Sequence, residues 1–131
     1  SRGQIARWAL HEVSADYDQV LVDWTDKPAA LLAANPMAKV PTLVHHDGGT
    51  DRVVTEAAAI CHYLAEMHPD RSLLPTDAEM ADYFRWMFFA AGPVEADLDD
   101  DLRLGGVAFD PCRASGEFGG CVHAASIQSQ A

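Results

Sequence analysis

The residues with the clearest potential for binding chemistry lie at two places between Met37 and Glu56. Pro41 removes a backbone donor and holds Val40 in the extended region of φ/ψ space. The N–H and C=O groups of Val40 are therefore not used in a helix and can pair with a group outside the chain. Thr55 is a good helix N-cap residue, and Glu56 would place a carboxylate in the first turn of the following helix.

A β-hairpin is predicted to hold these two places. The polar run HDGGTD at 46–51 separates two β-branched segments, which favours an antiparallel hairpin with strands at 42–45 and 52–54. A further strand is predicted at 17–22 from its weak alternation and β-branched content.

Two amphipathic helices are predicted on either side of these strands in the sequence. The first begins near Arg2 with Ser1 as its cap, and its apolar positions are Ile5, Trp8, Ala9 and Val13. The second covers 56–67, and its apolar face is formed by Ile60, Leu64 and Met67.

The motifs VPTL at 40–43 and TEAAAI at 55–60 together resemble the glutathione-binding half of the glutathione transferase family. The run SRGQIARWAL at 1–10 resembles the first helix of bacterial members. The resemblance covers roughly 1–98 and implies a partial α/β thioredoxin-like fold with its first strand missing, followed by the beginning of an all-α C-terminal domain. A complete member is considerably longer, so we expect this chain to be a fragment.

The resemblance also implies a glutathione site. Val40 would pair with the cysteinyl backbone of glutathione like an added strand, with Pro41 as the cis-proline. Thr55 and Glu56 would hold the γ-glutamyl group at the helix start, and Lys39 would supply a positive charge. The competing interpretations are an ordinary capped helix at Thr55 and a solvated lysine at Lys39.

Catalysis in the resembling family means lowering the pKa of the glutathione thiol, because the thiolate is the nucleophile. The hydrogen-bond donor belongs to the loop after the family's first strand. Ser1 is the remaining candidate for this role, although it also serves as a simple helix cap. In the family that strand is central and pairs with both 17–22 and 42–45, so the sequence predicts two exposed strand edges and a chain that is itself a poor enzyme.

The resemblance also implies a domain organisation. Residues 1–70 would form the incomplete glutathione-binding domain, and 71–104 would form a linker and the first helix of the helical domain. Thr76 and Glu79 form a capping box at that helix start, and Gly92-Pro93 should kink or stop the helix. The helix carries an apolar stripe that is either core or part of a dimer contact: Met80, Tyr83, Phe84, Met87 and Phe88. Residues 105–131 lack helical periodicity and are predicted to be an atypical, disordered tail.

Composition excludes several classes of partner. The net charge of −11 argues against nucleic acid, and no apolar run approaches the ~20 residues of a membrane span. Three cysteines without a C-x-x-C pair predict a reducing cytoplasm and no disulfide framework. No metal is expected, since His45 and His46 are adjacent in a strand and point to opposite faces, and Cys112, Cys121 and His123 lack the spacing of a zinc site.

The resemblance therefore implies a cytoplasmic, homodimeric glutathione transferase of the detoxification type, which joins glutathione, as co-substrate, to a small electrophile. Two alternatives remain. One is a glutathione-dependent isomerase or reductase of the same superfamily, and the other is a non-catalytic interaction module.

Overall fold

The computed structural model describes residues 2–95 and 122–128. The chain divides into two compact units, the first formed by Ser1–Ser72 with Gly120–Ala131 and the second by Leu73–Gly119. The candidate catalytic Ser1 and the tail cysteines Cys112 and Cys121 lie outside the described residues.

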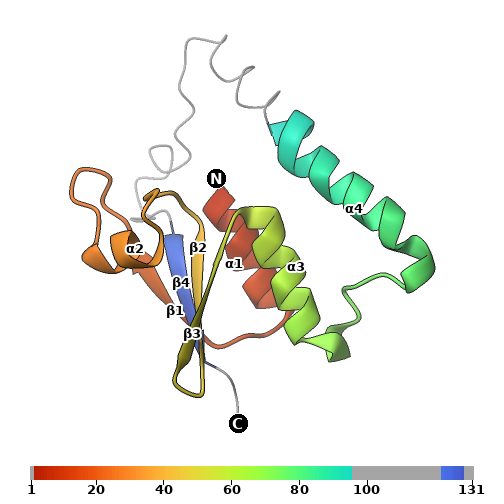
Figure 1. Ribbon diagram of the computed structural model, residues 1–131, viewed down its shortest axis with the longest axis horizontal. Coiled ribbons are helices and arrows are strands. Elements are labelled where there is room, and N and C mark those ends of the chain that lie inside the picture. Colours follow the sequence, from red (N-terminus) through yellow and green to blue (C-terminus); the bar gives the residue numbers. More distant parts are fainter. Residues whose placement is uncertain (1, 96–121, 129–131) are drawn as a thin grey trace. The chain divides into compact units, whose positions relative to one another are not determined.

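The first unit is built on a four-stranded sheet with the order β1-β4-β2-β3 (Figure 1). Its strands are β1 (Tyr17–Leu21), β2 (Thr42–Asp47), β3 (Thr50–Thr55) and β4 (Val122–Gln128). β2 and β3 form the predicted antiparallel hairpin, with a register that runs from Thr42 opposite Thr55 to Asp47 opposite Thr50. The two turn residues Gly48 and Gly49 have positive φ angles of 57° and 97°, which is why this tight turn needs glycine.

The strand β4 was not predicted, and it changes the description of both the C-terminal tail and the sheet. It lies between β1 and β2, antiparallel to β1 and parallel to β2. The prediction of a disordered tail is therefore wrong for residues 122–128. The prediction that the facing edges of β1 and β2 are left without hydrogen-bond partners is wrong as well, because β4 pairs with both. The physical reason is that two adjacent unpaired edges form a template, which an extended segment can satisfy through its backbone alone.

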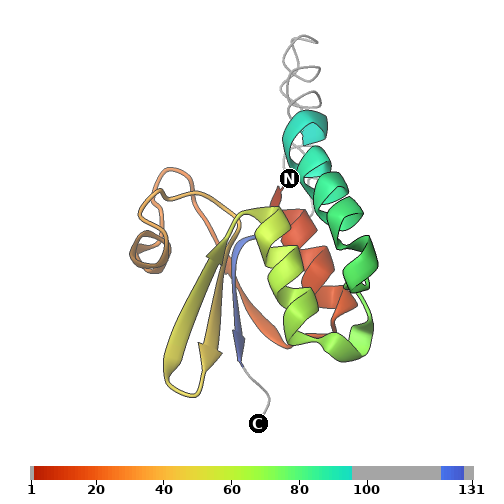
Figure 2. The same ribbon diagram turned by 45° about the vertical axis from the view of Figure 1, so that its right-hand side comes forward.

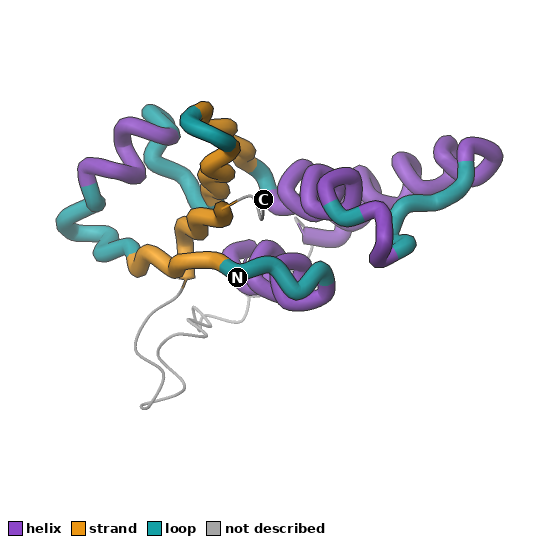
Figure 3. The backbone as a smooth tube through the Cα atoms, turned by 90° about the horizontal axis from the view of Figure 1, so that it is seen from below, coloured by secondary structure: helices purple, strands orange, loops and turns teal. Residues whose placement is uncertain are grey.

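Helices cover both faces of this sheet. α1 (Arg2–Glu12) and α3 (Ala57–Met67) pack together on one face, while α2 (Ala29–Ala34) lies on the other (Figure 2). The view from below shows the same three layers, with the strands between α2 and the α1–α3 pair (Figure 3). A short 3₁₀ turn, η1 (Pro69–Arg71), follows α3.

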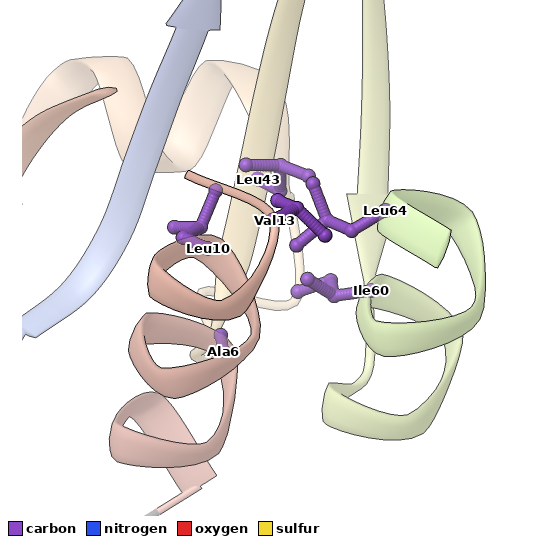
Figure 4. Close-up of a cluster of buried hydrophobic side chains, with 6 residues drawn as sticks. All are labelled: Ala6, Leu10, Val13, Leu43, Ile60 and Leu64. Atoms are coloured by element: carbon purple, nitrogen blue, oxygen red, sulfur yellow. The ribbon is translucent and has the colours of Figure 1, made fainter. Parts of the chain in front are cut away.

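The buried core of the first unit joins α1, β2 and α3 (Figure 4). It is formed by Ala6, Leu10, Val13, Leu43, Ile60 and Leu64. The predicted apolar face of α1 is confirmed for Val13, which is buried, and for Ala9, which packs against the core. It is wrong for Trp8, which is 65% exposed, while the smaller Ala6 is buried. In α3 the prediction holds for Ile60 and Leu64 but not for Met67, which is 42% exposed. Small side chains on the inner face of α1 let the helix approach its neighbours closely.

The second unit contains one helical segment within its described part. A 3₁₀ turn, η2 (Asp77–Glu79), leads into α4 (Met80–Phe89), which continues into a π-helical stretch, η3 (Ala90–Val94). The predicted capping box is confirmed, since the Glu79 carboxylate accepts hydrogen bonds from the Thr76 N–H at 3.2 Å and from its hydroxyl at 2.7 Å.

Two expectations for this segment are corrected. Of the two outcomes predicted for Gly92-Pro93, a kink or a stop, the stop is wrong: the helix continues through Pro93 with π geometry, where proline cannot donate an i→i−4 hydrogen bond. The aromatic stripe of α4 is not core among the described residues: the helix buries no side chain, and Phe88 is 66% exposed. None of the helices in the described part of the chain combines the length and apolar character that a bilayer span requires.

Candidate functional site

The hairpin register brings the two predicted binding places together. Thr42 and Thr55 form the first pair of the β2–β3 ladder. Val40 and Pro41 directly precede this pair on one strand, and Glu56 directly follows it on the other. The start of β2 and the N-terminal ends of α1 and α3 lie at the same end of the sheet (Figures 1 and 2).

Val40 presents the free backbone segment that the sequence predicted. The Val40–Pro41 peptide bond is cis, as the resemblance implied. Within the described residues, neither the N–H nor the C=O of Val40 has a hydrogen-bond partner, because the β2 ladders begin at Thr42. Both groups therefore remain available to an extended ligand.

Asn35, whose role was not predicted from the sequence, fixes the loop that carries this segment. Its Nδ2 donates to the Lys39 carbonyl at 3.1 Å and to Thr42 Oγ1 at 3.3 Å, and its Oδ1 accepts from the Met37 N–H at 3.1 Å. The Thr42 hydroxyl donates to the same Lys39 carbonyl at 2.9 Å. Asn35 and Thr42 are 7% and 1% exposed, so a buried polar network holds the loop. The signal in the sequence was an asparagine and a threonine that flank a proline-containing loop.

Lys27 also binds the loop that Asn35 fixes. Its Nζ donates to the Ala38 carbonyl at 3.3 Å and lies 5.3 Å from the centre of the Trp24 ring. Lys39, the predicted cation, is exposed and forms no ion pair with any residue of the described ranges. Lys39 is thus the freer of the two ammonium groups near the cis-proline.

The start of α3 differs in one respect from the prediction. Thr55 ends β3 and Glu56 occupies the N-cap position, so the assignment of Thr55 as the N-cap is wrong. Glu56 has φ 70° and ψ 128°, a region that costs a non-glycine residue about 1–3 kcal/mol and that concentrates at binding sites. This backbone turns the chain directly from strand to helix, leaving no room for the extra capping residue.

The N-terminus of α3 is open for a ligand as a result. No side chain caps it, and the first intrahelical hydrogen bond runs from the Ile60 N–H to the Glu56 carbonyl at 2.9 Å. The N–H groups of Ala57, Ala58 and Ala59 therefore lack intrahelical acceptors. Such groups favour an anion, and the exposed Glu56 carboxylate beside them favours a cation.

Other reactive side chains of the first unit do not belong to this end of the sheet. Cys61 lies in α3, and partial burial raises the pKa of its thiol, which keeps it protonated rather than nucleophilic. His45 and His46 point to opposite faces, as predicted: His45 is buried with its Nδ1 2.6 Å from Tyr63 Oη, while the exposed His46 pairs with Asp51. Across the described ranges, no cluster of three potential metal ligands forms.

A sheet with helices on both faces, and a cis-proline that opens β2 beside the N-terminus of α3, defines a thioredoxin-like domain. Residues 2–67 match the family model described as glutathione S-transferase, N-terminal domain. The chain belongs to the glutathione S-transferase family.

Three relatives illustrate the range of named activities. The chain is 43% identical over 61 residues to pyrimidodiazepine synthase of Drosophila melanogaster, an alignment covering 47% of this chain and 25% of that protein. It is 47% identical over 73 residues to a probable maleylacetoacetate isomerase of Caenorhabditis elegans, covering 54% and 32%. It is 37% identical over 89 residues to glutathione S-transferase 2 of Schizosaccharomyces pombe, covering 63% and 38%. The chain thus spans well under half the length of these relatives.

Proposed function

We propose that this chain carries the glutathione-binding part of an enzyme that adds the glutathione thiolate to a small electrophile. The observation that carries the proposal is the register pair Thr42–Thr55, which places the cis Val40–Pro41 segment beside the open N-terminus of α3. Glutathione has groups that match this end of the sheet: a peptide backbone, a γ-glutamyl carboxylate and amine, and a glycine carboxylate.

Each matching group in the chain has a distinct role in this proposal. The free N–H and C=O of Val40 pair with the cysteinyl backbone of glutathione, which fixes the thiol position. The N–H groups at the start of α3, with the Thr55 hydroxyl beside them, hold the γ-glutamyl carboxylate, and Glu56 holds its amine. Lys39 attracts the glycine carboxylate. Ser1, or a residue preceding α1 in a longer parent, donates to the thiolate.

A second activity is favoured by one relative. The similarity to a probable maleylacetoacetate isomerase supports a glutathione-dependent isomerase that uses the same glutathione site. A non-catalytic module would keep the site and lack turnover. The complete protein is proposed to act as a cytoplasmic homodimer, which fits the free, half-buried thiol of Cys61 and the exposed aromatic side chains of α4.

Substitution of Glu56 tests the binding site. Glu56→Ala should weaken glutathione binding roughly tenfold or more, because a charge-assisted hydrogen bond contributes about 1.5–3 kcal/mol. Glu66→Ala is the matched control on the same helix, where an exposed carboxylate lies 3.5 Å from His62 and contributes little. Isothermal titration with glutathione measures both constants, and equal losses in the two variants would make Glu56 a structural residue only.

Turnover assays then separate the three functions. Conjugation of an activated aryl halide, measured for the chain and for a version extended with the preceding segment of its gene, should be faster in the extended version. Isomerisation of a cis-enone diacid without conjugation would favour the isomerase, and glutathione binding without either activity in both versions would favour the module.

A further inference from the structure

Ala38, in the loop that leads to the proposed glutathione site, has a strained backbone. Its φ angle of 53° lies in the left-handed region, which a residue with a Cβ atom rarely adopts. Two hydrogen bonds hold it there: its N–H donates to the Asn35 carbonyl at 2.8 Å, and its carbonyl accepts from Lys27 Nζ at 3.3 Å. The second bond ties this loop to the loop between β1 and α2, 11 residues earlier in the chain (Figure 1).

The peptide plane between Lys39 and Val40 is held as well. The Lys39 carbonyl accepts hydrogen bonds from Asn35 Nδ2 at 3.1 Å and from the Thr42 hydroxyl at 2.9 Å. The Val40 N–H lies in the same plane as this carbonyl, because a peptide unit is planar. Both peptide planes that precede Val40 are therefore fixed by hydrogen bonds before a ligand arrives, and the first of them is fixed through the Ala38 carbonyl.

Lys27 is itself held in place. The residue is half-buried, and its Nζ lies 5.3 Å from the centre of the Trp24 ring, within the range of a cation–π contact. The loop that carries both residues is folded on itself, since Asp23 Oδ1 accepts from the Thr25 N–H at 2.8 Å and from its hydroxyl at 2.7 Å. Pro28 then restricts the backbone at the start of α2. The ammonium group is thus held against the Ala38 carbonyl.

We propose that Lys27 is a positioning residue for the glutathione site, which acts through Ala38 on the backbone of Val40. The inference rests on the proposed function, in which Val40 pairs with the cysteinyl backbone of glutathione. A loop that already has its bound conformation binds more tightly, because less conformational freedom is lost on binding. Lys39 has a different role in the proposed function, since its charge attracts the glycine carboxylate. The two lysines should therefore respond differently to a change in that carboxylate.

Two ligands separate positioning from direct contact. They are glutathione and its glycinamide analogue, which lacks the glycine carboxylate and carries no net charge. Lys27→Met should weaken both ligands by the same factor, at least about fivefold, because the backbone contact is common to both. Lys27→Arg keeps a cationic donor and should restore binding to within about twofold of the unmodified chain. Lys39→Met should weaken glutathione far more than the analogue.

Arg71→Met is the control for the change in net charge. Arg71 lies in η1, which follows the C-terminal end of α3, whereas the proposed site lies at the N-terminal end of that helix. This variant should leave both dissociation constants unchanged. Isothermal titration measures the constants for all four variants and for the unmodified chain.

NMR of the chain without ligand provides a second measurement. In Lys27→Met the amide signals of Ala38, Lys39 and Val40 should move, and in Lys27→Arg they should return, while an unchanged amide of the buried Ile60 shows that the fold is kept. Three results would each overturn this inference alone: unchanged signals at 38–40, full affinity of Lys27→Met for glutathione, or a loss of affinity confined to glutathione and absent for the analogue. A lack of glutathione binding by the unmodified chain would overturn the proposed function, and this inference with it.

Discussion

Tyr63 is the residue through which α3 is tied to the hairpin by polar contacts. Its hydroxyl lies 2.6 Å from Nδ1 of the buried His45, and the two rings meet edge to face. Arg52, opposite His45 in the ladder, has a raised pKa because of its hydrogen bond to Tyr63 and the nearby Asp47 carboxylate. The Tyr63 hydroxyl thus satisfies the buried imidazole of His45 and contributes to the raised pKa of Arg52.

Removing this phenol oxygen should be costly. Tyr63→Phe should lower the free energy of unfolding by about 1–3 kcal/mol, because the buried His45 nitrogen loses its partner. Tyr17→Phe is the matched control, since Tyr17 packs at the edge of the core and no described residue bonds to its hydroxyl. Urea unfolding of both variants measures the difference, and equal losses would mean that the contact between the Tyr63 hydroxyl and His45 adds no stability of its own.

The role of a residue was predictable from the sequence where it depends on the residue's immediate neighbours in the chain. Pro41 restricts its own neighbour, so the free Val40 segment followed from the sequence. The buried role of Asn35 did not, because its partners Lys39 and Thr42 meet it only once the loop folds back. The N-cap shifted from Thr55 to Glu56 because the β3 ladder extends through Thr55 and competes for it.

At the scale of elements, the start of the second unit shows how a local motif can be predicted and tested. The hydrogen bond from the Thr76 side chain, followed by that from its backbone N–H, lowers the pKa of Glu79. A carboxyl whose pKa is lower in the folded state stabilises that state above its unfolded pKa, and the stabilisation is lost as pH falls through the folded pKa. The capping box should therefore open on acidification.

Thr76→Ala should raise the pKa of Glu79 toward its ordinary value, because the larger of the two hydrogen bonds disappears. Thr25→Ala is the control: the Thr25 side chain lowers the pKa of Asp23 in the same way, so that variant should shift Asp23 and leave Glu79 unchanged. Carboxyl chemical shifts followed by NMR across the acid range report both groups. A Glu79 titration unaffected by Thr76→Ala would mean that the box does not persist in solution.

The strands and helix ends were otherwise more predictable than helix faces. The hairpin, β1 and the capping box depend on turn residues and alternation within a few positions. The buried face of α1 depends on which side chains fit against β2 and α3. Ala6 and Leu10 are therefore buried there, while the larger Trp8 is exposed. Placement of β4 could not be predicted, because its partners lie some hundred residues earlier in the chain.

At the scale of the whole molecule, the two units differ in how much they bury. α3 buries Ala57, Ile60, Leu64 and Ala65, whereas α4 buries no side chain in the part of the chain that the structure describes. Short helices without a buried face are marginal in water, since most helical stability comes from packing. The chain should therefore combine a cooperatively folded first unit with a helix that opens on its own.

Hydrogen exchange measures this difference directly. Amides of α4 should exchange much faster than those of α3. Leu64→Ala, at a fully buried position, should destabilise the first unit by about 2–5 kcal/mol and speed exchange in α1 and α3 by roughly thirtyfold or more, while α4 stays unchanged. Met67→Ala, on the same helix but 42% exposed, is the control and should change neither. Slow exchange in α4, or acceleration of α4 by Leu64→Ala, would show that the two units fold as one cooperative body.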